Sequence, residues 1–264
     1  MDHELGGPGG SDYGRDIERD LGDSPPAAIR DTAPDILGPI DANAPVSGHK
    51  PIYEERGETI SHAPENDFEA ASRLILPSFR PVGTSGQPIL EIPPDGLDAS
   101  TKAHTQPLID EGPCGIPVVY TIAAEGFDVV VNGDHVLAWG VPVASVQDAA
   151  IANLAGWSAT AAWTDEVSGD RRLLSSDTGD GHDAVRILLP EVREHLAHEL
   201  GAGGRVLIGL PERHLLLAGT LRPGDTEFAA LFSEFVIEHS GGADEPIDRR
   251  VFELVGGSLV EFKA

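Results

Sequence analysis

The composition of this chain changes abruptly near residue 68, and the change limits how much of the chain can fold. Residues 1–67 contain nine glycines and eight prolines, and their large apolar residues stand singly and without a regular spacing. Ordering such a segment costs conformational entropy that little apolar burial would offset. From residue 68 onward, apolar runs recur at the spacings of helices and strands. We therefore predict a disordered acidic tail over residues 1–67 and a single folded domain over residues 68–264.

The predicted tail has two interpretations. Stretches 33–40 and 51–53 carry the apolar residues that a partner protein would order on binding. On composition alone, an inert, solvating leader is the favoured interpretation. Both interpretations stay open at this point.

The charge of the chain bears on its partners. Asp and Glu number 44 against 18 Lys and Arg, which gives a net charge of −26. Proteins bind nucleic acids and anionic membranes mainly through Lys and Arg. The sequence therefore predicts no nucleic acid and no membrane among the partners.

The sequence also bears on the compartment and on cofactors. A single cysteine, Cys114, excludes an internal disulfide and a cysteine zinc site. The first residues lack a basic and apolar signal segment, and no apolar run approaches the roughly 20 residues that span a bilayer. We predict a cytoplasmic protein without a cofactor, and its oligomeric state stays open.

The periodicities after residue 68 predict an α+β domain with a largely antiparallel mixed sheet and about three packed helices. The helices are expected at residues 145–157, 188–200 and 225–239, where apolar residues fall on one helical face. Most neighbouring strands are linked by turns too short for a parallel crossover. Strands are expected in the following stretches: 89–92, 118–122, 127–131, 159–163, 171–174, 205–209, 215–221, 252–254 and 258–262.

Several stretches of the domain together resemble one family. They are Pro117-Val118-Val119-Tyr120, the run 149–154, the run 180–190 and the run 206–217. Their order and spacing resemble the YtpQ-like family, whose activity is undetermined, over roughly residues 70–262. The resemblance implies a small bacterial-type protein. This chain departs from the family pattern at His182, where an aromatic residue is usual, and at Glu212-Arg213-His214, where Ser-Arg-Asp is usual.

Two turns hold the polar residues that most invite a function. Asp180, His182 and Asp183 lie in an acidic, glycine-containing turn, and with His214 they are the candidates for acid and base catalysis. An acidic turn that caps the next segment is the simpler interpretation. Glu212, Arg213 and His214 lie at the tip of an expected hairpin, where a rigid support would hold charged side chains in water. We predict a partner-binding surface at this tip.

Other patterns favour structural roles. His195 and His198 stand three residues apart but do not match the HExxH motif of zinc proteases, so a solvated helix face is favoured and no metal site is predicted. Cys114 has no motif that marks an activated nucleophile. The three tryptophans, Trp139, Trp157 and Trp163, are expected to complete the core, with an aromatic ligand pocket as the alternative.

These observations favour a non-enzymatic, protein-binding module, of a chaperone-like or adaptor-like kind, with the acidic tail as a regulatory arm. The alternative is a hydrolase that uses the 180–183 and 212–214 turns together. That alternative requires the two turns to meet in the fold.

Overall fold

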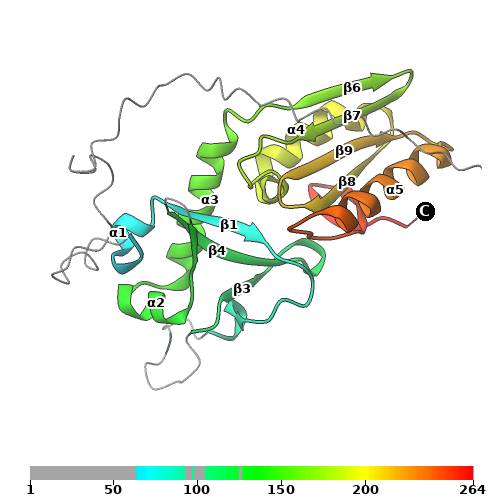
Figure 1. Cartoon of the computed structure of the whole chain (residues 1–264). Coiled ribbons are helices and arrows are strands. Elements are labelled where there is room, and N and C mark those ends of the chain that lie inside the picture. Colours follow the sequence, from blue (N-terminus) through cyan, green and yellow to red (C-terminus); the bar gives the residue numbers. More distant parts are fainter. Residues whose placement is uncertain (1–63, 93–96, 98–104, 125–126, 264) are drawn as a thin grey trace, which may run out of the picture. The chain divides into compact units, whose positions relative to one another are not determined.

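The computed structural model describes residues 64–92, 97, 105–124 and 127–263 (Figure 1). The described residues all belong to one compact unit. The predicted tail therefore lies outside the described residues except for its last four. Those four belong to the fold: Pro64–Asn66 is a 3-10 helix (η2), and the indole Nε1 of Trp139 donates to the Glu65 carbonyl at 2.8 Å. The described fold therefore includes residues 64–67, which precede the boundary predicted at residue 68.

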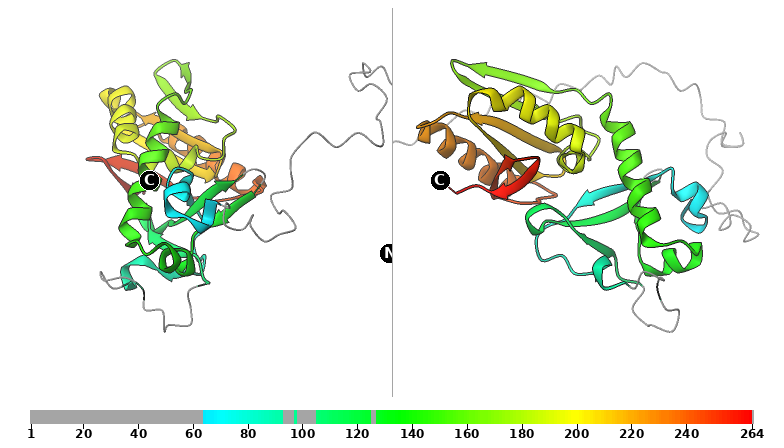
Figure 2. Two further views of the ribbon diagram at one scale, coloured as in Figure 1. Left: turned by 90° about the vertical axis from the view of Figure 1, so that its left-hand side faces the viewer. Right: turned by 180° about the vertical axis from the view of Figure 1, so that it is seen from behind.

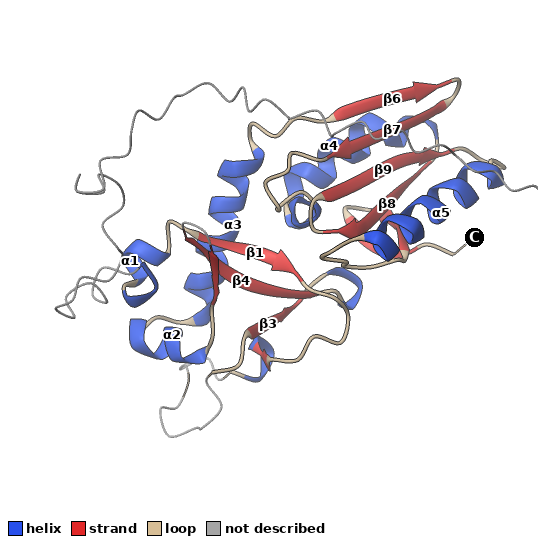
Figure 3. Cartoon of the chain, viewed as in Figure 1, coloured by secondary structure: helices blue, strands red, loops and turns tan. Residues whose placement is uncertain are grey.

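The α+β class is confirmed, but the strands form two sheets where the sequence led us to expect one (Figure 3). The first sheet has the order β1-β4-β3-β2, with β5 also paired to β4, and is antiparallel except for the β2–β3 pair. Its strands are β1 (Ile75–Phe79), β2 (Gln87–Pro88), β3 (Leu108–Glu111), β4 (Pro117–Ala124) and β5 (Phe127–Val130).

The second sheet is wholly antiparallel, with the order β11-β10-β8-β9-β7-β6. The hairpin predicted around residues 205–221 forms the centre of this sheet. Its strands, β8 and β9, are buried along almost their whole length. The strands are β6 (Thr164–Ser168), β7 (Arg171–Ser176), β8 (Arg205–Glu212), β9 (Leu215–Leu221), β10 (Val251–Val255) and β11 (Ser258–Glu261).

The three predicted helices are present, and two shorter ones precede them. The five α-helices are α1 (Phe68–Ala71), α2 (Gly133–Trp139), α3 (Val143–Ser158), α4 (Pro190–Leu200) and α5 (Thr226–Gly242). Four further 3-10 turns are η3 (Ile89–Glu91), η4 (Pro113–Gly115), η5 (Ala184–Leu188) and η6 (Gly201–Gly203). The strand predicted at 89–92 is thus η3, and the strand predicted at 159–163 is irregular, with β6 following it.

Helix α3 connects the two sheets. Its buried face, which includes Val146, Ala150 and Leu154, packs against β1 of the first sheet and against η5, which belongs to the second half of the chain. Asn153 fixes the helix to β1, because its Nδ2 donates to the carbonyls of Ser72 and Ile75 at 2.8 Å each. One apolar cluster joins residues of both sheets and of this helix, and a second cluster lies between α5 and the second sheet.

Helices α4 and α5 contact the same two strands of the second sheet, from its two faces (Figures 1 and 2). The alternation of side chains along β9 explains this: Thr220 donates to the carbonyl of Leu200 on α4, whereas Gly219 meets α5. A Cβ at Gly219 would lie 2.8 Å from the ring of Phe228, and one at Gly209 would lie 2.6 Å from Val236. Glycine at these two positions lets α5 lie close to the sheet.

Candidate functional site

The turn at residues 176–186 is built around a buried arginine. Arg186 is 1% exposed, and its guanidinium pairs with Asp183, which is fully buried, and with Asp180 at the margin of the turn. Asp183 also accepts hydrogen bonds from the Ser176 hydroxyl at 2.6 Å and the Thr178 amide at 3.1 Å. A buried ion pair needs such additional hydrogen bonds to offset its loss of hydration. The acidic residues of this turn therefore hold Arg186 in the interior. Arg186 was not among the residues predicted from the sequence to be functional.

The tip of the β8–β9 hairpin lies against this turn. The Nε of Arg213 donates to the Gly181 carbonyl at 2.9 Å, and the Ala184 amide donates to the Arg213 carbonyl at 3.2 Å. The Arg213 guanidinium also lies 3.2 Å from Glu245 and 3.3 Å from Asp128, and its side chain is only 21% exposed. The expectation that Arg213 projects freely into water is wrong, because the turn and these two carboxylates occupy its donors.

His182 is buried within the same turn. It is 5% exposed, and its ring meets Trp157 edge to face, with centroids 5.3 Å apart. Its Nδ1 is buried and has no hydrogen-bond partner among the described residues. Burial lowers the pKa of His182, and the nearby Asp180 only partly opposes this shift. The ring is thus held neutral and serves as a packing partner for Trp157.

The 180–183 and 212–214 turns meet, as the hydrolase alternative requires, but Asp180, His182 and Asp183 are held in contacts of the fold. Burial alone would raise the pKa of Asp180, yet the His182 amide and the Arg186 charge outweigh it and lower that pKa. A general base works best with a pKa near the working pH, so a carboxylate held ionised by an arginine is a weak one. Asp183 likewise faces Arg186, and His182 is enclosed. The geometry gives these residues a structural task.

Glu212 and His214 occupy a different position from Arg213. They line an open, polar cleft of about 620 Å³ between the hairpin tip and the end of α5. His214 is 43% exposed at its side chain and lies 3.8 Å from Glu245. The remaining lining residues are Glu238, His239, Gly242, Ala243, Asp244 and Glu245. A binding role for Glu212, Arg213 and His214 stays a prediction.

The other candidate residues are dispersed. His195 and His198 are exposed on α4, and nearby Glu199 pairs with Arg172 at 2.8 Å. Within the part of the chain that the structure describes, no three His, Cys, Asp or Glu side chains are placed to hold a metal ion. The Cys114 thiol donates to the Leu259 carbonyl at 3.2 Å, and burial raises its pKa, which lowers its nucleophilicity.

The tryptophans do not gather in one pocket, because each meets its own histidine. Trp139 packs on Phe68 and His135, Trp157 on His182, and Trp163 on His195. Trp157 is 49% exposed, so its predicted place in the core is wrong.

No helix among the described residues is long and apolar enough to cross a membrane.

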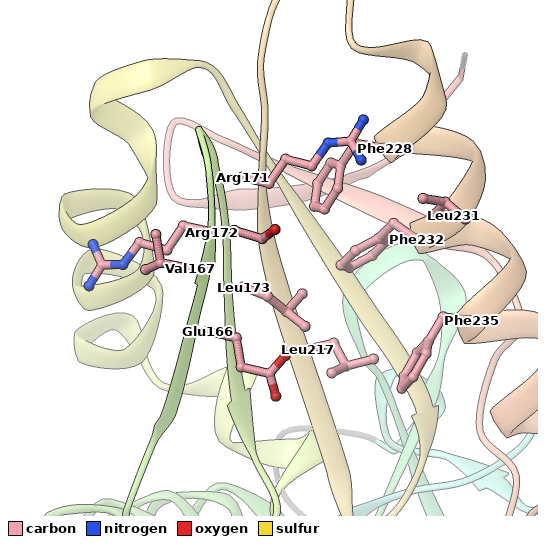
Figure 4. Close-up of a pocket in the computed structure, with 11 residues that line it drawn as sticks. Glu166, Val167, Arg171, Arg172, Leu173, Leu217, Phe228, Leu231, Phe232 and Phe235 are labelled. Atoms are coloured by element: carbon pink, nitrogen blue, oxygen red, sulfur yellow. The ribbon is translucent and has the colours of Figure 1, made fainter.

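An apolar groove that the sequence did not reveal lies beside α5 (Figure 4). The apolar face predicted for this helix is only partly buried, because Phe232 is buried while Leu231 is 50% and Phe235 40% exposed. Together with Phe228 they form one wall of a groove of about 350 Å³, which we call the α5 groove. Its other lining residues are Glu166, Val167, Ser168, Arg171, Arg172, Leu173 and Leu217.

Strand pairing explains the floor of the α5 groove. Leu173 of β7 lies opposite Gly219, the residue beneath Phe228, so the side chain of Leu173 is on the face that α5 covers. Glu166 lies opposite Leu173 on β6 and shares this face. Arg172 points to the other face, where it binds Glu199 of α4. The floor is therefore apolar beneath α5 and becomes acidic at the edge strand β6.

One end of the α5 groove is fixed by ion pairs. Arg171 donates to both oxygens of Asp225, at 2.8 and 2.7 Å, and to Glu227 at 2.6 Å. Its guanidinium lies 5.8 Å from the centre of the Phe228 ring. Asp225 also caps α5 by accepting from the Phe228 amide. These contacts neutralise Arg171 and tie the start of the helix to β7.

Comparison with known proteins adds no relative: no family model matches the chain, and neither the curated proteins nor the solved structures contain a match. The resemblance to the YtpQ-like family stays a prediction, and the function is inferred from the geometry alone.

Proposed function

We propose that this chain is a non-enzymatic, chaperone-like or adaptor-like module that binds an apolar segment of another protein in the α5 groove. The observation that carries the proposal is the exposure of Leu231 and Phe235 on a wall shared with Phe228. Contiguous apolar surface of this kind on a soluble fold is typical of interaction sites. Aromatic residues in a concave, apolar seat are also the usual anchors of protein interfaces.

The rigidity of the groove supports the same proposal. Its floor belongs to β9, β7 and the edge strand β6 of a six-stranded sheet, and its wall is a helix capped by Asp225 and tied to β7 by Arg171. A preformed site loses little entropy when it binds. The hydrolase alternative has less support, because Asp180 and Asp183 are held by Arg186 and His182 is enclosed, which leaves His214 as its one exposed candidate. The regulatory role of residues 1–63 concerns a part of the chain outside the described residues and stays a prediction.

The test compares two variants of the full chain in partner capture. In the first, Leu231→Ser and Phe235→Ser are combined, which removes apolar surface without changing charge. In the second, Ile237→Ser alters a residue of the same helix that is 53% exposed but does not line the groove. Captured proteins are identified and quantified by mass spectrometry from a native lysate.

We expect at least about tenfold weaker capture by the groove variant, which corresponds to about 1.4 kcal/mol. Capture by the Ile237→Ser chain should match that of the wild type. Equal capture by all three proteins, with unchanged thermal melts, would contradict the proposal. If partner capture is lost in Arg213→Ala instead, the binding surface would lie at the hairpin tip.

A further inference from the structure

One face of the second sheet is covered by α5 alone, although this face is wide enough for two helices. On the face that carries α5, the helix contacts β8 and β9, and the strands beyond them on one side are β7 and β6. Strands are spaced about 4.8 Å apart, so these two strands offer a width of about 10 Å. Packed helices lie about 8–10 Å apart. The uncovered width therefore matches one additional helix lying beside α5.

The length of the apolar wall fits the same occupant. Phe228 and Phe235 are separated by seven residues of α5, which corresponds to about 10 Å along the helix axis. An amphipathic helix with apolar residues at positions i, i+4 and i+7 presents a stripe of the same length. Two to three turns would be enough to cover Leu173 and Leu217 on the floor and to contact Leu231 on the wall.

A strand would use this surface poorly. The free edge of the sheet is β6, whose five residues are all exposed. A strand added there would lie about 4.8 Å beyond β6, and its side chains would meet Glu166 and Ser168. The phenylalanines of α5 and the leucines of the floor would stay uncovered.

The charges at the two margins of the α5 groove indicate which residues should flank the apolar stripe of the bound helix. At 100° per residue, Glu227, Glu234 and Glu238 follow Leu231 around α5 on the side away from the sheet, and all three are exposed. Glu166 marks the opposite margin, on β6. Of the two arginines that line the groove, Arg172 points to the other face and Arg171 is neutralised by Asp225 and Glu227. Both margins therefore favour Lys or Arg on the incoming helix.

A second copy of the chain is a poorer occupant. Residues 226–242 contain three glutamates and no Lys or Arg, so packing α5 of one copy into the groove of another would bring like charges together. The net charge of −26 on each chain adds to this repulsion.

From these observations, we infer that the α5 groove receives an amphipathic helix of a partner protein, with an apolar stripe flanked on both sides by basic residues. The inference rests on the proposed function and names the class of partner. It predicts binding by helix insertion beside α5, with the basic residues of the partner facing Glu166 on one margin and the glutamates of α5 on the other.

The experiment uses three fluorescent peptides and fluorescence anisotropy. The first has leucines at helical spacing and lysines elsewhere, the second replaces every lysine with glutamate, and the third has the composition of the first with leucine and lysine in strict alternation, a strand pattern. Each is titrated with the full chain, the Leu231→Ser/Phe235→Ser variant and the Ile237→Ser variant. Both variants keep the charge of the protein, so nonspecific attraction of lysine peptides is equal in all three.

We expect the helical lysine peptide to bind at least about tenfold more tightly to the wild type and to Ile237→Ser than to the groove variant. The glutamate peptide should bind at least about tenfold more weakly. Equal binding of the lysine and glutamate peptides would overturn the basic flanks. Groove-dependent binding of the alternating peptide alone would overturn the helix while leaving the proposed function intact.

Light scattering of the chain without peptide supplies a separate outcome. A dimer that the groove variant abolishes would show that a second copy occupies the groove, and the inference would fail. If no peptide depends on the groove and partner capture is also unchanged in the groove variant, the inference and the proposed function fail together.

Discussion

At the scale of single residues, Arg186 should carry much of the stability of the second half of the chain. Replacing it with methionine keeps the aliphatic stem but leaves Asp183 charged and without its main partner in a fully buried position. Removing one member of a buried pair costs about 3–5 kcal/mol. Urea denaturation should report this loss.

The same substitution at Arg73 provides the control. Arg73 pairs with Glu69 on the surface, where both side chains are more than 70% exposed, at 74% and 80%. An exposed pair contributes at most about 1 kcal/mol. Losses of equal size in Arg73→Met and Arg186→Met would mean that the 176–186 turn does not hold its charges as described.

His182 predicts a pH dependence of stability. Its pKa is lowered in the folded chain by burial, whereas the unfolded chain keeps a value of about 6.5. As pH falls below that value, the unfolded chain takes up a proton that the folded chain does not, so the free energy of unfolding decreases. His182→Phe, which preserves the ring contact with Trp157, should reduce the loss of stability between about pH 6.5 and pH 5.

Urea midpoints at these two pH values test the prediction. His198→Gln alters an exposed histidine and serves as the matched control. A pH dependence that is the same in His182→Phe and the wild type would contradict the enclosure of His182. His135, whose pKa is also lowered by burial, accounts for part of the dependence that remains.

At the scale of elements, the contact of α5 with the sheet should be sensitive to a single methyl group. A Cβ at Gly209 would lie 2.6 Å from Cγ2 of Val236, a fully buried residue of α5. Gly209→Ala should therefore destabilise the chain by about 1–3 kcal/mol, as overpacking in cores does. Gly241→Ala, in the last turn of the same helix with open space around it, should be neutral or slightly stabilising. Thermal melts that rank the two variants in the opposite order would refute this account of the α5 contact.

The elements also show what sequence alone can predict. The three longer helices and the 205–221 hairpin were predicted correctly because apolar periodicity and short polar turns are local signals. The division into two sheets was missed, since a strand pattern does not say which strands pair. The predicted start of α3 at residue 145 was also two residues late, because the helix starts at Val143 after Pro142.

The site escaped prediction for a related reason. Periodicity correctly placed Leu231 and Phe235 on the apolar side of α5, but burial depends on how far the sheet extends beneath that side. Arg186 was overlooked because arginine is rarely buried, and only the fold brings Asp183, Asp180 and Ser176 around it. The meeting of the 180–183 and 212–214 turns likewise could not be predicted, because it depends on tertiary structure.

At the scale of the whole molecule, the net charge of −26 predicts an unusual response to salt. Self-repulsion at this charge destabilises the folded state, and it is screened as the Debye length falls from about 10 Å at 0.1 M salt to about 3 Å at 1 M. Screening also weakens exposed ion pairs, but each of these contributes little. The melting temperature should therefore rise by several degrees on adding NaCl, as calorimetry can measure. A fall would mean that the surface ion pairs outweigh the repulsion.

The arrangement of the sheets along the chain has a consequence for biosynthesis. All strands of the first sheet and helix α3 precede residue 159, and all strands of the second follow it, so each half completes its pairing from a continuous stretch. A nascent chain emerging from the ribosome can therefore finish the first half before the second is translated. Contacts such as Cys114 with Leu259 must then form after the second half is translated, and the rate at which the Cys114 thiol becomes protected from alkylation would report when the two halves join.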